Sequence, residues 1–368
     1  SKLYLDVTGR VDWSSALAWT DTKSVAYPSV GVSAILTELL PIKNNVLTFL
    51  KVRGSYSEVG NAPTRYIAYQ TYPYESASPV TAPNTDIKPE RTKAWEVGLQ
   101  SHLWNDRLEL NVSLYKTSTY NQLFNPSISA SSGYSSIYIN GGQVDNKGIE
   151  ASLTLNQPLG PVKWNSTFTY TINRNKIKKL LKPTTLSSGE VVKQDMMDLG
   201  GLEIVNSRLF EGGSIGDLYV TALRTDSHGY IDVDYVNNTV AIDNKAGERQ
   251  DGWIYAGNSQ AKYMMGWRNS FSWKGLTLSC LVNARIGGIV VSQTQAMMDA
   301  YGVSTATAEA RDLGYVLIDG YKVPAVQKYY STVGSGVGSM YVYSATNVRL
   351  AELSLGYNIP VQKWVPWI

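Results

Sequence analysis

Residues 212–216, Gly-Gly-Ser-Ile-Gly, place a serine between glycines in the spacing of the nucleophile elbow found in many hydrolases. That motif works only where a strand runs into it, a helix leaves it and a histidine acts as the base. No strong strand pattern precedes residue 212, no clear helix pattern follows residue 216, and His102 and His228 are the only histidines. We therefore interpret these glycines as turn formers, and we expect no catalytic residues and no enzyme activity.

The sequence also contains no motif that indicates a metal site or a cofactor site. The acidic stretch 226–234 lacks the glycine and the late glutamate at the positions that an EF-hand loop requires, so it predicts a surface hairpin turning at Gly229. The glycine-rich stretch 334–338 lacks the strand-to-helix unit that cradles phosphate, and it predicts a flexible loop tip. Because the chain has a single cysteine, Cys280, besides its two histidines, we expect no metal site and no cofactor.

The composition narrows the class of protein further. Charged residues make up only 17% of the 368 residues and aromatic residues make up 11%, whereas ordinary soluble domains carry about 25% charged residues. The formal net charge of +3 is too balanced to favour a nucleic-acid partner. No run of 18 apolar residues is present, so the chain is either soluble or meets a membrane through strands.

Strands are what the hydrophobic pattern predicts. Apolar and polar residues alternate in segments of about ten residues, the length that a tilted strand needs to cross a bilayer. In the clearest segment, Leu108, Leu110 and Val112 alternate with polar residues. Three hairpins are predicted in this way, at 94–103 with 107–117, at 148–156 with 162–173, and at 262–273 with 276–286. Weaker alternation predicts four more strands, at 3–9, 28–37, 47–56 and 347–357.

Two features of these ten segments favour a membrane barrel over a soluble sheet. Their connections are alternately long and short, which is typical of an outer-membrane barrel with short periplasmic turns and long extracellular loops. Charged residues also share the polar side of their strands, and a lysine or arginine facing hydrocarbon would cost about 2 to 4 kcal/mol. The charges predicted to face a watery lumen are Lys51, Arg53, Glu96, Glu109, Glu150, Lys163, Arg268, Arg285 and Glu352. We therefore predict an all-β fold, an antiparallel transmembrane β-barrel in contact with outer-membrane lipid.

Aromatic residues near both ends of the strands support this prediction, because amphipathic rings favour the headgroup level of a bilayer. The band beside the short connections is predicted to contain Trp104, Trp164, Trp273, Trp364 and Trp367. The band beside the long connections is predicted to contain Tyr56, Tyr115 and Tyr120. The alternative is that these rings form the core of a soluble sheet.

Candidate binding residues lie on the long loops and on the polar side of the strands. Loop tyrosines either stack on sugar rings and peptide side chains, or pin the loops to one another, and the sequence leaves both interpretations open. The candidates for substrate binding are Tyr66, Tyr69, Tyr72, Tyr74, Tyr134, Tyr138, Arg268 and Arg285. Residues 294–312 lack alternation and are rich in helix formers, so a short helix is predicted there.

Several segments resemble the SusC-like branch of the TonB-dependent outer-membrane transporters, and they occur in that family's order. The most telling are Tyr4-Leu5-Asp6-Val7-Thr8-Gly9-Arg10, Leu50-Lys51-Val52-Arg53-Gly54-Ser55-Tyr56, Trp95-Glu96-Val97-Gly98-Leu99, Asn146-Lys147-Gly148-Ile149-Glu150 and Glu352-Leu353-Ser354-Leu355-Gly356-Tyr357. Such segments span nearly the whole chain. The match is looser at Ala351, where a further basic residue is expected, so a role of this position in a charge cluster is in doubt.

The resemblance implies a 22-stranded barrel in the bacterial outer membrane, closed by an N-terminal plug domain and driven through the TonB complex. It also implies a SusD-like surface lipoprotein as a lid, a dimer of transporter–lid pairs, and oligosaccharides or oligopeptides as cargo. Residues 1–368 are then expected to be the C-terminal part of the barrel domain, lacking the plug, the TonB box and the final strands. Further strands are expected to complete the wall, because open strand edges in lipid leave backbone groups unpaired.

We therefore expect active import of an oligomeric nutrient across an outer membrane, without covalent chemistry. Two alternatives remain open at this point. One is a passive porin or adhesin barrel, and the other is a soluble carbohydrate-binding or hydrolytic β protein.

Overall fold

The computed structural model describes residues 2–68, 81–125, 134–185, 191–237 and 239–359. The chain divides into two compact units. Unit 1 comprises Ser1–Asp195, Lys262–Arg285 and Asn347–Ile368, and unit 2 comprises Met196–Ala261 and Ile286–Thr346. Among the described residues, no helix combines the length and the apolar character needed to cross a membrane.

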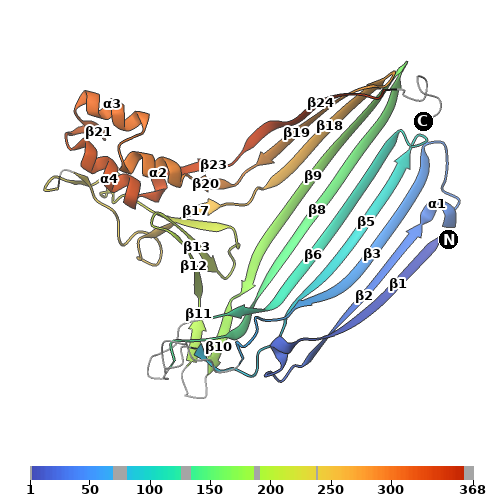
Figure 1. Cartoon of the computed structure of the whole chain (residues 1–368), viewed down its shortest axis with the longest axis horizontal. Helices are drawn as coiled ribbons and strands as arrows, with labels where there is room; N and C mark the ends of the chain where they lie inside the picture. Colours follow the sequence, from blue (N-terminus) through green and yellow to red (C-terminus); the bar gives the residue numbers. More distant parts are fainter. Residues whose placement is uncertain (1, 69–80, 126–133, 186–190, 238, 360–368) are drawn as a thin grey trace. The chain divides into compact units, whose positions relative to one another are not determined.

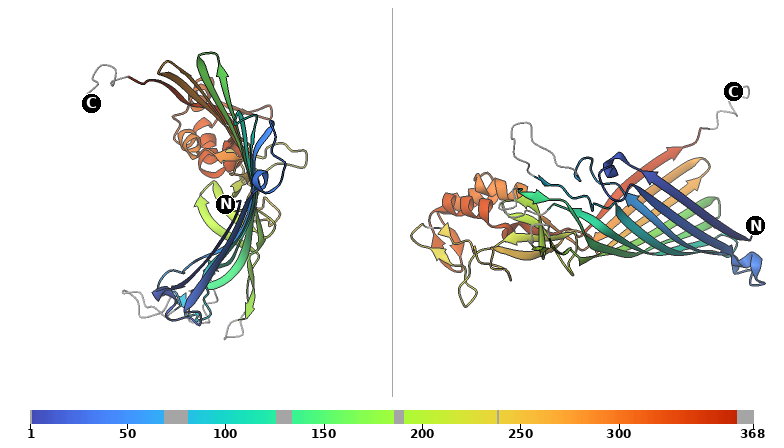
Figure 2. Two further views of the ribbon diagram at one scale, coloured as in Figure 1. Left: turned by 90° about the vertical axis from the view of Figure 1, so that its right-hand side faces the viewer. Right: turned by 90° about the horizontal axis from the view of Figure 1, so that it is seen from below.

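Unit 1 is built on one antiparallel sheet of ten strands, which follow one another in chain order across the sheet (Figure 1). The left view of Figure 2 shows this sheet nearly edge-on, as a single curved layer. The strands are β1 (Leu3–Trp13), β2 (Ser24–Ile35), β3 (Leu47–Asn61), β5 (Glu90–Leu103), β6 (Leu108–Phe124), β8 (Ile139–Leu159), β9 (Val162–Lys179), β18 (Tyr263–Trp273), β19 (Leu276–Ile286) and β24 (Asn347–Tyr357). All ten strands predicted from the alternation are confirmed.

Three of the hairpin turns explain why these strands pair so tightly. Lys274 and Gly275, between β18 and β19, both have positive φ angles, of 46° and 86°. This is the backbone of the two-residue turn whose twist matches that of paired strands. Asn105 and Asp106, between β5 and β6, also adopt positive φ, which their short polar side chains tolerate. Gly160, with a φ of 61°, begins the turn between β8 and β9.

The two faces of the sheet differ in chemistry along the middle of the strands, because residues that pair across strands point to the same side. One face carries a large set of exposed apolar side chains there, and we call it the apolar face. It includes Leu5, Val7, Val30, Val32, Trp95, Val97, Leu114, Ile149, Leu153, Phe168, Trp267, Phe271, Leu276, Leu278, Leu353 and Leu355. The opposite, polar face carries hydrogen bonds between strands, such as Thr154 to Thr167 at 3.0 Å and Ser279 to Ser270 at 3.2 Å.

Two polar side chains on the apolar face are capped by tryptophans. Asn269 is only 7% exposed, and its Oδ1 accepts a hydrogen bond from Trp164 Nε1 at 3.1 Å. Trp267 Nε1 donates to Ser166 Oγ at 3.0 Å in the same way. The indole N–H groups thus satisfy these two polar oxygens on a face that is mainly apolar.

The structure corrects two details of the sequence-based picture. The connection at residues 36–46, predicted to be short, contains α1 (Leu36–Leu39) and is no shorter than the connection at 14–23. Tyr115, predicted for a membrane-facing band, lies on the polar face instead, with its ring over Gly148 and its hydroxyl donating to Asn173 at 3.3 Å. Tyr56 does fit such a band, because its ring packs at a tilt against exposed Trp95, with centroids 4.4 Å apart. Trp364 and Trp367 lie outside the described residues.

Short elements complete unit 1 beside the sheet. They are the 3-10 helix η1 (Ser15–Leu17) and the strands β4 (Thr81–Ala82), β7 (Ser136–Ile137), β10 (Leu181–Thr185) and β11 (Val191–Gln194). Strands β4 and β7 pair in parallel, so the connections 62–89 and 125–138 are joined to each other. Leu17 packs with Val25 and Tyr27 in a small buried cluster.

Unit 2 consists of the two longest connections, which share one apolar core. Its strands are β12 (Met196–Leu202), β13 (Val205–Phe210), β14 (Asp217–Thr221), β15 (Val233–Asp234), β16 (Thr239–Val240), β17 (Trp253–Asn258), β20 (Ile289–Val291), β21 (Val316–Ile318), β22 (Tyr321–Val323) and β23 (Val342–Ser344). Its helices are α2 (Gln293–Ala300), α3 (Thr305–Leu313), α4 (Val326–Gly336) and the 3-10 helix η3 (Gly338–Tyr341). The core joins Ile204 and Val240 from the first connection to Ala296, Val333 and Val337 from the second.

The helical part of unit 2 confirms one expectation and contradicts another. The helix predicted within 294–312 is present, as the pair α2 and α3. The glycine-rich stretch 334–338, predicted to be a flexible loop tip, instead ends α4 and begins η3. Gly334 packs against the carbonyl oxygen of Ala296, and Gly338 packs against that of Ile204. Glycine serves there for close helix packing rather than for chain freedom.

Candidate functional site

Arg53 of β3 lies flat along the polar face of unit 1. It pairs in register with Gly98 of β5, and a Cβ on Gly98 would come within 2.6 Å of its guanidinium carbon. Because glycine leaves that space, the guanidinium crosses β5 and donates to Ser113 Oγ and, at 3.3 Å, to Asn111 Oδ1 on β6. Its Nη2 also lies 3.4 Å from Glu96 Oε1. Two of the charges predicted to face a lumen are thus paired on one wall.

Both arginines predicted as binding residues belong to the same face. Arg268 of β18 donates to Glu352 Oε2 of β24 at 2.8 Å, across the intervening strand β19. The ladder between β19 and β24 skips Ala351, a β-bulge that keeps Glu352 on the polar face. Arg285 pairs in register with Asn347 at the far end of β19 and is exposed. Ala351 itself takes no part in the charge pair.

The structure does not gather the predicted tyrosines into one site. Tyr66 is 64% exposed and has a positive φ of 68°. Tyr138 packs against the buried cluster of Ile67, Ala68 and Ile87, so it pins one loop to another. Tyr134 is half-buried. Tyr69, Tyr72 and Tyr74 lie outside the described residues.

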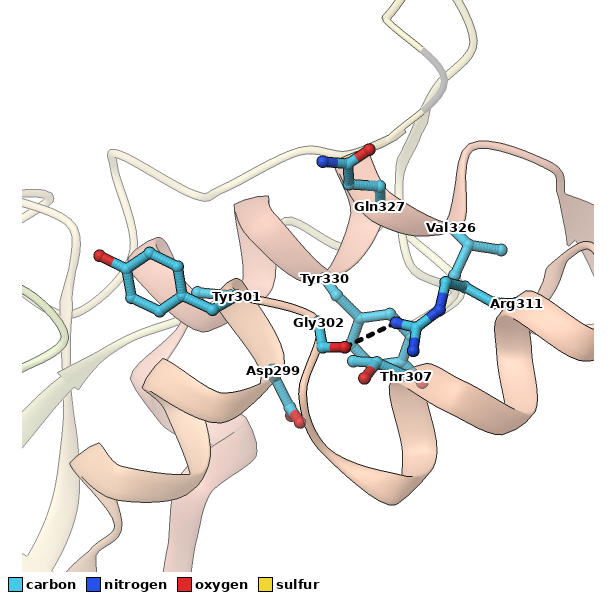
Figure 3. A pocket seen from close by; sticks show the side chains of 9 residues that line it. Asp299, Tyr301, Gly302, Thr307, Arg311, Val326, Gln327 and Tyr330 are labelled. Carbon is cyan, nitrogen blue, oxygen red and sulfur yellow. Dashed lines mark hydrogen bonds between the residues drawn. The ribbon is translucent and has the colours of Figure 1, made fainter.

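Unit 2 contains a concave site that sequence reasoning missed. It lies between α2, α3 and α4 and encloses about 340 Å³ (Figure 3). Asp299 is buried, and its carboxylate oxygens accept hydrogen bonds from Gln295 Nε2 and the Tyr341 hydroxyl, each at 2.9 Å. Arg311 is exposed and donates through Nη1 to the carbonyl oxygen of Gly302 at 2.6 Å, the dashed line in Figure 3.

Local signals for the two helices were present in the sequence. Ser292 Oγ accepts from Gln295 N, and Ser304 Oγ accepts from Thr307 N, each at 3.2 Å. A serine directly before a helix is a standard start signal. These caps position Asp299 and Arg311, but nothing local in the sequence shows that α4 packs beside them.

The buried tyrosines of this region predict an alkaline limit to the stability of unit 2. Burial, with Tyr330 and Asp299 nearby, raises the pKa of Tyr329 to about 12, and burial with the Asp299 hydrogen bond also raises the pKa of Tyr341. An unfolded tyrosine titrates near pH 10, so above that pH the unfolded chain releases these protons first. The stabilisation is therefore complete below about pH 10 and is lost as the pH rises towards 12.

We expect the melting temperature of unit 2 to fall over that interval, and to fall less steeply in Tyr329→Phe, which removes one of the buried hydroxyls. Thermal unfolding followed by circular dichroism between pH 8 and pH 11.5 measures this. Parallel curves for both proteins would contradict the assignment.

Within the described ranges, no group of three or more His, Cys, Asp or Glu side chains is arranged to hold a metal ion.

Comparison with known families and proteins gives a consistent picture. A family model described as "TonB dependent receptor-like, beta-barrel" matches residues 1–278. TonB-dependent receptor P3 of Formosa agariphila is 26% identical over 389 residues, covering 98% of this chain and 37% of the relative. TonB-dependent receptor P26 of the same organism is 25% identical over 391 residues, covering 98% of this chain and 38% of the relative. The chain thus spans less than two fifths of these relatives.

Solved structures show the same fold. The RagAB peptide transporter is 20% identical, with a TM-score of 0.72, and the match covers 99% of this chain and 40% of that one. The RagAB peptide importer in its "open-open" state gives a TM-score of 0.75 at 20% identity, covering 99% of this chain and 39% of that one. At this identity the likeness concerns the fold of the chain.

Proposed function

We propose, because the chain belongs to the family of TonB-dependent receptor-like β-barrels, that the complete protein actively imports an oligomeric nutrient. The family places the barrel in the bacterial outer membrane. The observation that carries the proposal is the two-faced sheet, which has exposed hydrocarbon on one side and a hydrogen-bonded polar network on the other. A soluble sheet would have to cover that apolar face with a second layer.

The chain supplies part of the wall in this proposal. Its sheet runs from β1 to β24 in ten strands, and we infer that further strands of the complete protein close the barrel. We place residues 1–368 in the C-terminal part of the barrel domain. A plug domain and a TonB box would lie elsewhere in the complete protein.

The proposed cargo is an oligosaccharide or an oligopeptide, captured together with a SusD-like lipoprotein lid. The SusC-like sequence segments support this choice, and the RagAB relative is a peptide transporter. Arg268, Arg285 and the exposed Tyr66 are proposed as contacts for the cargo, because all three are accessible. A dimer of transporter–lid pairs is the proposed assembly.

A passive barrel is the competing function, and energy coupling separates the two. Growth on separate polysaccharide hydrolysates and peptide digests first identifies the nutrient whose use requires the complete protein. Uptake of that nutrient is then expected to fall to the level of cells that lack the protein. We expect this fall when a protonophore collapses the proton gradient, and also when the TonB box is deleted. Immunoblots of outer membranes check that the protein remains present. Undiminished uptake under both conditions would identify a passive porin.

A further inference from the structure

The pocket of Figure 3 has a neighbouring hollow on the surface of unit 2. A second hollow of about 760 Å³ adjoins it along α4, and the two share Arg311, Val326 and Gln327 as lining residues. Lys328 lines only the second hollow. Arg311 therefore lines both hollows, which we together call the groove.

The side chain of Arg311 is oriented by a hydrogen bond to the backbone. Its Nη1 donates to the Gly302 carbonyl at 2.6 Å. Gly302 has a φ of +69°, and a Cβ there would come within 3.1 Å of the same nitrogen. Glycine thus permits both the backbone bend and the close approach. Fixing one guanidinium nitrogen leaves the other edge, Nε and Nη2, oriented for a bidentate partner.

No carboxylate in the groove neutralises this arginine. Among the described residues Arg311 forms no ion pair. Asp299 is the one acidic residue that lines either hollow, and both of its oxygens already accept hydrogen bonds. Lys328 adds a second positive charge, and its Nζ lies 3.5 Å from Asn237 Oδ1. Among the residues that line the two hollows, the positive charges of Arg311 and Lys328 outnumber the single negative charge of Asp299.

The groove is also lined by aromatic rings and an amide side chain, which suit a polar oligomer built of sugar rings or peptide units. Tyr301 is 77% exposed beside Gly302, and Tyr330 is half-buried with its hydroxyl 3.4 Å from the Ala306 carbonyl oxygen. Gln327 is exposed and offers an amide. Aromatic rings pack against sugar rings or apolar side chains, and the amide pairs with hydroxyl or peptide groups.

We propose that this groove binds the carboxylate-bearing end of the imported oligomer, with the free edge of Arg311 gripping the carboxylate. The proposal rests on the proposed function and adds that the groove recognises a carboxylate of the cargo. The carboxylate comes either from a uronic acid unit of a glycan or from the C-terminus of a peptide. Both sources present the same planar group to the guanidinium.

Binding to the purified complete protein, measured by isothermal titration calorimetry, tests this. The probes are trigalacturonate, trialanine, amidated trialanine and neutral maltotriose. Arg311→Gln is expected to weaken binding of the preferred carboxylate probe about 10-fold or more, and Arg311→Lys to weaken it less. The matched control is Arg224→Gln, which removes an arginine of unit 2 that is already paired with Asp232 at 2.7 Å. That control is expected to change nothing.

The probes also distinguish the two sources of the carboxylate. An Arg311-dependent loss confined to trigalacturonate identifies a uronate, and one confined to trialanine, with no binding of its amide, identifies a peptide terminus. Failure of both carboxylate probes to bind the unaltered protein, or equal affinities in Arg311→Gln, would overturn the assignment. If uptake still depends on the proton gradient in Arg311→Gln and is not reduced, the proposed carboxylate site is wrong while active import stands. If binding depends on Arg311 but uptake does not depend on the proton gradient, active import is wrong while the site stands.

Discussion

Arginine in place of Leu153 is expected to lower the free energy of unfolding of the complete barrel by about 2 to 4 kcal/mol, the cost of a cation at the middle of a bilayer. Leu153 lies near the centre of the apolar face, 41% exposed, between Leu110 of β6 and Phe168 of β9. Both neighbours are apolar, so the guanidinium finds no counter-charge beside it. Urea titration of protein refolded into lipid vesicles, followed by tryptophan fluorescence, measures the loss.

The matched control is Ser152→Arg, one residue earlier on the same strand. Ser152 pairs with Asn111 and Thr169 on the polar face, so its arginine meets water and polar groups. We expect a change of less than about 0.5 kcal/mol, as for an ordinary surface substitution. Equal losses in the two variants would show that the faces of β8 are assigned the wrong way round.

Alanine in place of Gly334 is expected to destabilise unit 2 by about 1 to 3 kcal/mol, the usual cost of overpacking a core. The added Cβ would overlap the Ala296 carbonyl oxygen and come within 2.6 Å of Ala300 N on α2. Both obstacles are backbone atoms of a packed helix, so neither can swing aside. Thermal unfolding and protease resistance of unit 2 within the complete protein measure the effect.

The sign of this effect makes the test decisive. Helix propensity alone would make alanine more stable than glycine by up to about 1 kcal/mol. Ser335→Ala, at the next position of α4, is the control, because Ser335 is exposed and its hydroxyl only bonds back to the Ser331 carbonyl. A Gly334→Ala protein as stable as the original would show that α2 and α4 are not packed this closely.

The strands were predictable because their signal is local. Apolar and polar residues alternate because one side of a strand faces hydrocarbon and the other faces water, so about ten consecutive residues are enough to predict each strand. The ends were less predictable, since β8 begins at Ile139 rather than near residue 148. Backbone pairing continues there through glycines and polar residues that show no alternation.

Unit 2 escaped prediction because its core joins segments that are far apart in the sequence. Ile204 packs with Val337, more than a hundred positions later, and no periodicity connects them. The candidate site divides in the same way. The alternation of apolar and polar residues along β18 was enough to predict that Arg268 lies on the polar face. The surroundings of Arg311 depend instead on α4, whose glycines were wrongly predicted to form a loop tip.

The glycines of the polar face have a consequence for the space in front of the wall. The side chain of Arg53 lies flat over Gly98, and the ring of Tyr115 lies over Gly148. Two large side chains therefore form only a thin layer on the sheet instead of standing upright from it. A side chain at position 98 would lift the Arg53 guanidinium off the sheet, and one at position 148 would also meet the Ile172 carbonyl oxygen of the neighbouring strand.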